Sequence, residues 1–138
     1  MYLLGFPLLI IPFAIYNIVA FILAQPESIW TTGAAHVSMT SGVVWRLTWE
    51  DIIIAGSILL LWIEVIKSTR ITVRAIVDHV LAMILFVGML IEFLLVREAG
   101  TSTFFLLLII GLVDVLAGFI ISIRSSGHQV EVESSAKT

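Results

Sequence analysis

Residues 103–123 read TFFLLLIIGLVDVLAGFIISI, an apolar run with a single carboxylate, Asp114, almost at its midpoint. As a helix rising about 1.5 Å per residue, this run is long enough to cross the roughly 30 Å hydrocarbon core of a bilayer. A carboxylate at that depth costs several kcal/mol if it stays charged and unpaired, so such residues usually face a bundle interior. Gly111 and Gly118 share a helical face with Asp114, which predicts close packing against another helix.

The composition of the whole chain agrees with a membrane protein. Of its 138 residues, 60% are hydrophobic and 12% are charged, and the mean hydropathy is +1.16. A soluble domain is about half apolar and about a quarter charged. The net charge of −3, without a basic block, argues against binding to nucleic acid. We therefore expect one integral membrane domain of the all-α class.

Cofactor and metal sites are not expected. The chain has no cysteine, which excludes disulfides, thiolate metal sites and cysteine nucleophiles. His36, His79 and His128 fall in three different segments, so they do not form the pair on facing helices that a bis-histidine haem requires. We predict no cofactor and no metal.

The hydropathy pattern predicts a four-transmembrane-helix bundle over residues 1–124. The expected spans are residues 3–24, 52–66, 75–96 and 103–123. The second is short, so it is expected to extend by a turn at each end or to lie where the bilayer is thinned. Pro7 and Pro12 should kink or delay the first helix, which lacks a basic leader and is read as a retained span. The polar tail, residues 125–138, is expected to be disordered.

Orientation follows from the basic residues. Lys67, Arg70 and Arg74 crowd the link between the second and third spans, whereas the outer side carries only Arg46 and Arg97. The positive-inside rule then places both termini in the cytoplasm and the loop of residues 25–51 outside. An outer aromatic belt would consist of Trp30, Trp45 and Trp49.

The outer loop alternates apolar and polar residues around the turn sequence Thr40-Ser41-Gly42. This pattern predicts a short amphipathic β-hairpin, and the alternative is a loop lying on the interface with its tryptophans among the lipid headgroups. Residues 48–51, Thr-Trp-Glu-Asp, resemble a capping box that opens the second span, with Asp in place of the usual Glu. If the protein works by association, the candidate partner-binding residues are Trp45, Leu47 and Trp49.

The intramembrane polar residues fall into layers when depth is counted along each span. The cytoplasmic layer holds Glu64, Lys67, Arg70, Arg74, Asp78 and His79, the outer layer holds Asn17, Ser57 and Glu92, and Asp114 lies between them. One interpretation is packing, through Glu64–Lys67 and Arg74–Asp78 pairs and a hydrogen bond from Asn17 or Ser57 to Glu92. The other is a candidate proton relay, in which Glu64, Asp78, His79, Asp114, Glu92 and Asn17 descend through the membrane.

Residues 51–124 resemble a group of small, uncharacterised four-span inner-membrane proteins of proteobacteria. The resemblance lies in Glu64-Val65-Ile66-Lys67, Val77-Asp78-His79, residues 91–96 (IEFLLV), residues 101–103 (TST) and residues 112–119 (LVDVLAGF). It implies a bacterial inner-membrane location and supplies no activity.

The function favoured by these observations is non-catalytic. The sequence contains no Gly-rich phosphate loop and no nucleophile–base pair at recognisable spacing, so an enzyme is not expected. We expect an accessory or scaffold subunit of a larger inner-membrane complex, with the lipid bilayer and either a membrane-protein partner or further copies of the chain as its partners. The alternative is a small oligomeric proton-coupled transporter or channel that uses Glu64, His79, Asp114 and Glu92.

Overall fold

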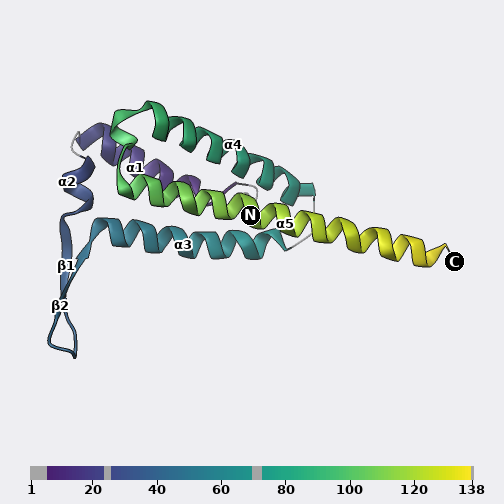
Figure 1. The fold of residues 1–138 in the computed structure, drawn as a ribbon, viewed down its shortest axis with the longest axis horizontal. Coiled ribbons are helices and arrows are strands. Elements are labelled where there is room, and N and C mark those ends of the chain that lie inside the picture. Colours follow the sequence, from purple (N-terminus) through teal and green to yellow (C-terminus); the bar gives the residue numbers. More distant parts are fainter. Residues whose placement is uncertain (1–5, 24–25, 70–72, 138) are drawn as a thin grey trace.

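The structure, a computed structural model, describes residues 6–23, 26–69 and 73–137. It is mostly helical, with one small antiparallel sheet (Figure 1). In chain order the elements are α1 (Ile10–Leu23), α2 (Pro26–Trp30), β1 (Gly33–Ser38), β2 (Val44–Thr48), α3 (Trp49–Ser68), α4 (Val73–Leu95), the 3-10 helix η2 (Arg97–Ala99) and α5 (Ser102–Ala136).

Helix α5 is the centre of the helical part. It packs against α3 and α4, which flank it on opposite sides in Figure 1, and α1 contacts α3, α5 and η2. Helices α3 and α5 both start at the end that carries the hairpin and run away from it. Helix α4, which lies between them in the chain, runs in the opposite direction. The C-terminus lies at the end away from the hairpin.

The helix boundaries follow the predicted spans with two informative differences. Helix α1 begins only at Ile10, after Pro7, and Pro12 lies in its first turn, where a missing N–H costs no helical hydrogen bond. Helix α3 extends beyond residues 52–66 at both ends, as expected for the short second span. Its start is set by Thr48, whose side chain accepts a hydrogen bond from the Asp51 N–H while Asp51 accepts one from the Thr48 N–H. The capping box is therefore confirmed.

Two of the described helices are long and apolar enough to cross a membrane, namely α4 over Ala75–Leu95 and α5. The expected number was four. Helix α1 is apolar but only 14 residues long. Helix α3 has 20 residues but carries Glu50 and Asp51 in its first turn and Lys67 in its last. The difference thus arises from a proline-delayed start in α1 and from the charged residues of α3, which include Glu64 within the helix as well as those at its ends.

The C-terminal tail differs from the expectation of disorder. Helix α5 continues without a break through residues 125–136 and ends at Ala136. Adding a residue to an existing helix fixes one residue for one new hydrogen bond, whereas nucleating a helix is costly. A polar segment that directly follows a long apolar helix can therefore remain helical, which composition alone did not indicate.

Residues 33–48 form the predicted β-hairpin, so this prediction is confirmed. Strands β1 and β2 pair antiparallel, with Val37 opposite Trp45 and Ala35 opposite Leu47. The Gly42 N–H donates to the Met39 carbonyl at 2.9 Å, and Gly42 has φ = 86°, the left-handed conformation that a three-residue hairpin turn needs. The predicted stripe of Trp45, Leu47 and Trp49 is corrected in one respect. Strand β2 ends at Thr48, so Trp49 is the first residue of α3 and leaves the alternation.

The best-packed apolar core lies at the hairpin end. Phe104 of α5 is fully buried at its centre, edge-on to Tyr16 with ring centroids 5.0 Å apart and parallel to Phe93 at 6.1 Å. Trp30 of α2 also stacks on Tyr16, with ring centroids 5.2 Å apart. These rings join α1, α2, α4 and α5, and they anchor the base of the hairpin to the helices.

Candidate functional site

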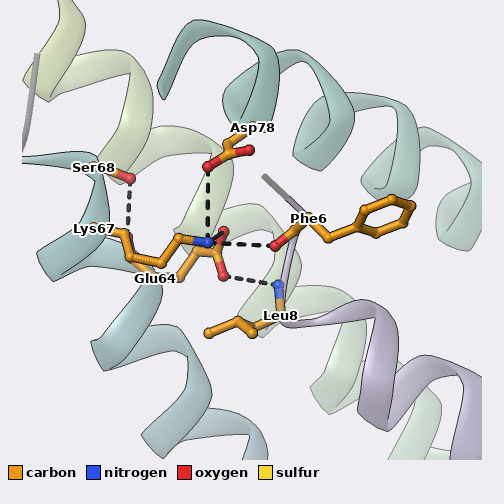
Figure 2. Close-up of polar contacts among 6 residues, drawn as sticks. All are labelled: Phe6, Leu8, Glu64, Lys67, Ser68 and Asp78. Atoms are coloured by element: carbon orange, nitrogen blue, oxygen red, sulfur yellow. Dashed lines mark hydrogen bonds and ion pairs between the residues drawn. The ribbon is translucent and has the colours of Figure 1, made fainter. Parts of the chain in front are cut away.

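A cluster of three charged side chains links α3 to α4 at the end away from the hairpin (Figure 2). The Lys67 Nζ lies 3.6 Å from the Glu64 Oε1 and 3.7 Å from the Asp78 Oδ2. The predicted Glu64–Lys67 pair is therefore confirmed. The other predicted pair involves Arg74, whose side chain lies outside the described parts of the structure. Among the described side chains, Asp78 pairs with Lys67 of the neighbouring helix. We refer to Glu64, Lys67 and Asp78 as the charged cluster.

The charged cluster also holds the segment that precedes α1. The Leu8 N–H donates to the Glu64 Oε2 at 2.8 Å, and the Lys67 ammonium donates to the Phe6 carbonyl at 3.3 Å (Figure 2). Glu64 is 4% exposed, so both of its oxygens are taken up within the protein. The sequence did not predict these contacts, because a backbone partner leaves no residue-specific signal. The cluster thus ties three parts of the chain together.

Asp114 is buried, as its position in the apolar run predicted. It is 5% exposed, and Gly111 and Gly118 on the same helical face are buried with it. Phe86 and Met89 of α4 pack beside Gly111. Glu64 and Lys67 are close enough to act on Asp114 electrostatically, yet no described residue forms a hydrogen bond or ion pair with it. Asp114 is therefore a buried acid next to the charged cluster and not a member of it.

His79 lies one helical turn from Asp114, as expected from its depth. Its ring rests against the backbone of Gly118, and a Cβ at that position would overlap the imidazole. The His79 Nε2 and the Asp78 Oδ1 are buried without a hydrogen-bond partner among the described residues. The glycine at position 118 therefore makes room for the histidine, and this contact sets the spacing of α4 and α5.

Glu92 forms the predicted contact with α1. The Asn17 Nδ2 donates to the Glu92 Oε2 at 3.4 Å, and also to the Phe13 carbonyl of its own helix at 3.2 Å. Ser57 takes no part, because its hydroxyl donates to the Ile53 carbonyl at 2.6 Å. Of the residues predicted for the outer layer, Asn17 and Glu92 are therefore in contact, between α1 and α4, and Ser57 is not part of that contact.

A buried apolar layer separates Glu92 from Asp114. Helices α4 and α5 are antiparallel, and Met89 packs beside Gly111, so Glu92 and Asp114 lie on opposite sides of this contact, about 9 Å apart along the helix axes. Met89 and Ile110 lie at about that level and are 2% and 8% exposed, and Gly111 is buried with them. The candidate relay residues hence form two groups within one copy of the chain, and not one continuous path.

A second polar network lies at the hairpin end, and the sequence did not predict it. The Tyr16 hydroxyl donates to the Glu98 carbonyl at 3.0 Å and shares a 2.5 Å hydrogen bond with the Thr101 hydroxyl. Thr101 is the N-cap of α5 and accepts from the Phe104 N–H at 3.2 Å. The short sequence Thr101-Ser102-Thr103 before an apolar run could have indicated the cap, but not its tyrosine partner.

Within the described residues, no three His, Asp or Glu side chains converge as metal ligands.

The chain matches no protein-family model, no curated protein and no solved structure. The resemblance to four-span inner-membrane proteins therefore stays a prediction.

Proposed function

We propose that this protein is an integral membrane protein with four spans, α1, α3, α4 and α5, and that it works without catalysis, by association. The observation that carries the proposal is the outward apolar surface of the helices. On α4, Ile76, Ile84 and Leu94 are 66%, 63% and 69% exposed. Soluble proteins rarely leave such continuous apolar surface in water, whereas lipid or another membrane helix covers it at little cost.

Helices α4 and α5 are long and apolar enough to cross a membrane. The lengths of α3 and α1 support two further spans. Helix α3, with 20 residues, is about 30 Å long, which matches the hydrocarbon core of a bilayer. Its Glu50 and Asp51 lie at one end and Lys67 at the other, where they can reach the interfaces. Helix α1 is about 21 Å long, and the segment from Phe6 extends it. The basic residues of the α3–α4 link favour a cytoplasmic location for both termini.

Association is favoured over transport because most intramembrane polar groups have partners within the chain. The charged cluster holds three segments together, and Asn17 binds Glu92. The apolar layer between Glu92 and Asp114 gives a single copy no polar path from one face to the other. These features suit a compact accessory or scaffold subunit in a larger complex of a bacterial inner membrane.

The test is to extract the protein gently from native membranes and identify what co-purifies. A stable complex with a second membrane protein, in fixed proportion, is expected. A protein recovered alone, as a monomer, from several mild detergents would contradict the proposal.

The second candidate function is proton-coupled transport by an oligomer, and Asp114 is the observation that favours it. This acid is 5% exposed and has no hydrogen-bond partner in the described parts of the chain. Reconstituted vesicles with an imposed pH gradient would test this function. Proton flux that is present in the parent and lost in Asp114→Asn would support transport over association.

A further inference from the structure

The β-hairpin has one apolar face and one largely polar face. Along the apolar face, Val37 pairs with Trp45, and Met39 and Val43 extend it toward the turn. These four side chains are 43%, 44%, 46% and 61% exposed, so the helices do not cover them. The opposite face carries His36 paired with Arg46 and Ser38 paired with Val44, of which only Val44 is apolar. A surface of this kind requires a partner that is apolar on one side.

The direction in which the hairpin projects from the helices determines where a partner of its apolar face would lie. In Figure 1 the hairpin lies across the end of the bundle and projects sideways beyond α3, instead of continuing the helix axes. An apolar groove occupies the angle between the two elements. Most of its lining residues are apolar, namely Trp45, Leu47, Ile52, Ile54, Ala55, Ile58 and Leu106, and the acidic residues Glu50 and Asp51 of the first turn of α3 also line it. Because Trp45 and Leu47 line this groove, the apolar face is turned toward the helices and the polar face away from them.

We propose that the hairpin is a lipid-binding element, which lies on the outer leaflet and holds the upper part of a phospholipid in the groove. The proposal rests on the four-span arrangement. If α3 crosses the bilayer along its axis, the space beneath the apolar face is the outer leaflet itself. The groove continues into the outward side chains of α3, where Ile58, Leu59 and Trp62 are 51%, 64% and 65% exposed.

A phospholipid suits both parts of this surface. The acyl chains would lie along α3 and beneath Val37 and Met39, while the indole of Trp45 occupies the interfacial depth that tryptophan prefers. His36 and Arg46 on the other face would stay in water. A protein partner for Trp45 and Leu47 would have to enter the angle that the bilayer already fills.

The chain has no cysteine, so single spin labels can be placed without background. We would label Val37→Cys on the apolar face and the adjacent Ser38→Cys on the polar face, and reconstitute each in vesicles of phosphatidylcholine and phosphatidylglycerol. Collision with oxygen, which concentrates in lipid, is compared with collision with a water-soluble nickel chelate. We expect the ratio of oxygen to nickel accessibility to be several-fold higher at position 37 than at position 38.

A third label, Ile84→Cys on the outward face of α4, reports membrane insertion independently. Nickel access at position 37 equal to that at position 38, with position 84 still in lipid, would overturn the proposal. Nickel access at all three positions would instead overturn the membrane location itself. A label at position 37 that is shielded in native membranes but exposed to nickel in vesicles would show a protein partner and not lipid.

A second set of variants tests the groove directly. Trp45→Ser with Leu47→Ser removes its apolar wall, and His36→Ser is the matched change on the polar face. With the label at position 37, the double variant should raise nickel access several-fold, and His36→Ser should leave it unchanged. Equal accessibility in both variants would contradict a lipid-holding groove.

Discussion

Asp114 and Glu64 are both buried acids, but they differ in what holds them. Glu64 accepts a hydrogen bond from the Leu8 N–H and forms an ion pair with Lys67. Asp114 has no such partner among the described residues. When one partner of a buried hydrogen bond is removed, the other group is left without a partner. The free-energy cost of that unsatisfied group exceeds the average contribution of a hydrogen bond to stability. The two residues should therefore respond differently to neutral replacement.

We predict that Asp114→Asn changes the free energy of unfolding by less than about 1 kcal/mol, because no hydrogen bond or ion pair to a described residue is lost. Glu64→Met should cost about 2 kcal/mol, since the Leu8 N–H and Lys67 each lose an acceptor. Thermal unfolding of both variants in one detergent measures the difference. Loss of expression for Asp114→Asn would mean that its carboxylate has a cationic partner, which would refute the assignment of an unpartnered acid.

The start of α3 depends on a single capping box at the base of the hairpin. The Thr48 backbone N–H, and then its hydroxyl, donate hydrogen bonds to Asp51, and these bonds hold the pKa of Asp51 below its ordinary value. A carboxyl group whose pKa is lower in the folded state stabilises that state above its unfolded pKa. This stabilisation is lost as the pH falls through the folded pKa.

We expect Asp51→Asn to lower the melting temperature at neutral pH, with a difference from the parent that shrinks as the pH falls below about 4. Melting curves between pH 7 and pH 3 measure this. The neighbouring variant Glu50→Gln is the control, because it removes a charge from the same turn but leaves the Thr48–Asp51 bonds in place. A difference between Asp51→Asn and the parent that persists unchanged at pH 3 would argue against the capping role.

The contact between α4 and α5 requires a glycine at one position and not at another. A Cβ at Gly118 would overlap the His79 ring, whereas a Cβ at Gly88 meets nothing within 4 Å. Alanine should gain up to about 1 kcal/mol of helix propensity at either position. At position 118 the overlap should cost about 1–3 kcal/mol in addition.

Gly118→Ala is therefore expected to be less stable than Gly88→Ala, as measured by thermal unfolding in detergent. Adding His79→Ala to Gly118→Ala should restore more stability than the two single changes predict. Equal stability of the two alanine variants would show that α4 and α5 can separate at no cost.

The topology of the whole chain distinguishes four spans from two. If α1, α3, α4 and α5 all cross the membrane, residue 28 lies outside and residues 68 and 125 lie in the cytoplasm. If only α4 and α5 cross, residues 28, 68 and 125 all share one side. Reporter fusions after Ser28, Ser68 and Ser125 are expected to place the first in the opposite compartment from the other two. The same compartment for all three would reduce the protein to two spans and remove the basis of the hairpin proposal.

The features that could be predicted from the sequence depend on neighbours along the chain. The apolar runs, the turn at Gly42 and the Thr48–Asp51 cap involve residues at most four positions apart, or a periodicity that the helix itself imposes. The burial of Asp114 beside Gly111 and Gly118 is of this kind. Its cause is the helical repeat, which places residues three and four apart on one face.

The remaining contacts join residues that are distant in the chain. The Leu8 N–H and Glu64 are separated by 56 positions, and Tyr16 and Thr101 by 85. Lys67 pairs with Asp78 because α3 and α4 bring the two side chains together. Such partners depend on how helices pack and turn against one another. That packing, and not local periodicity, divides the polar residues of the helices into two groups and turns the apolar face of the hairpin toward the helices.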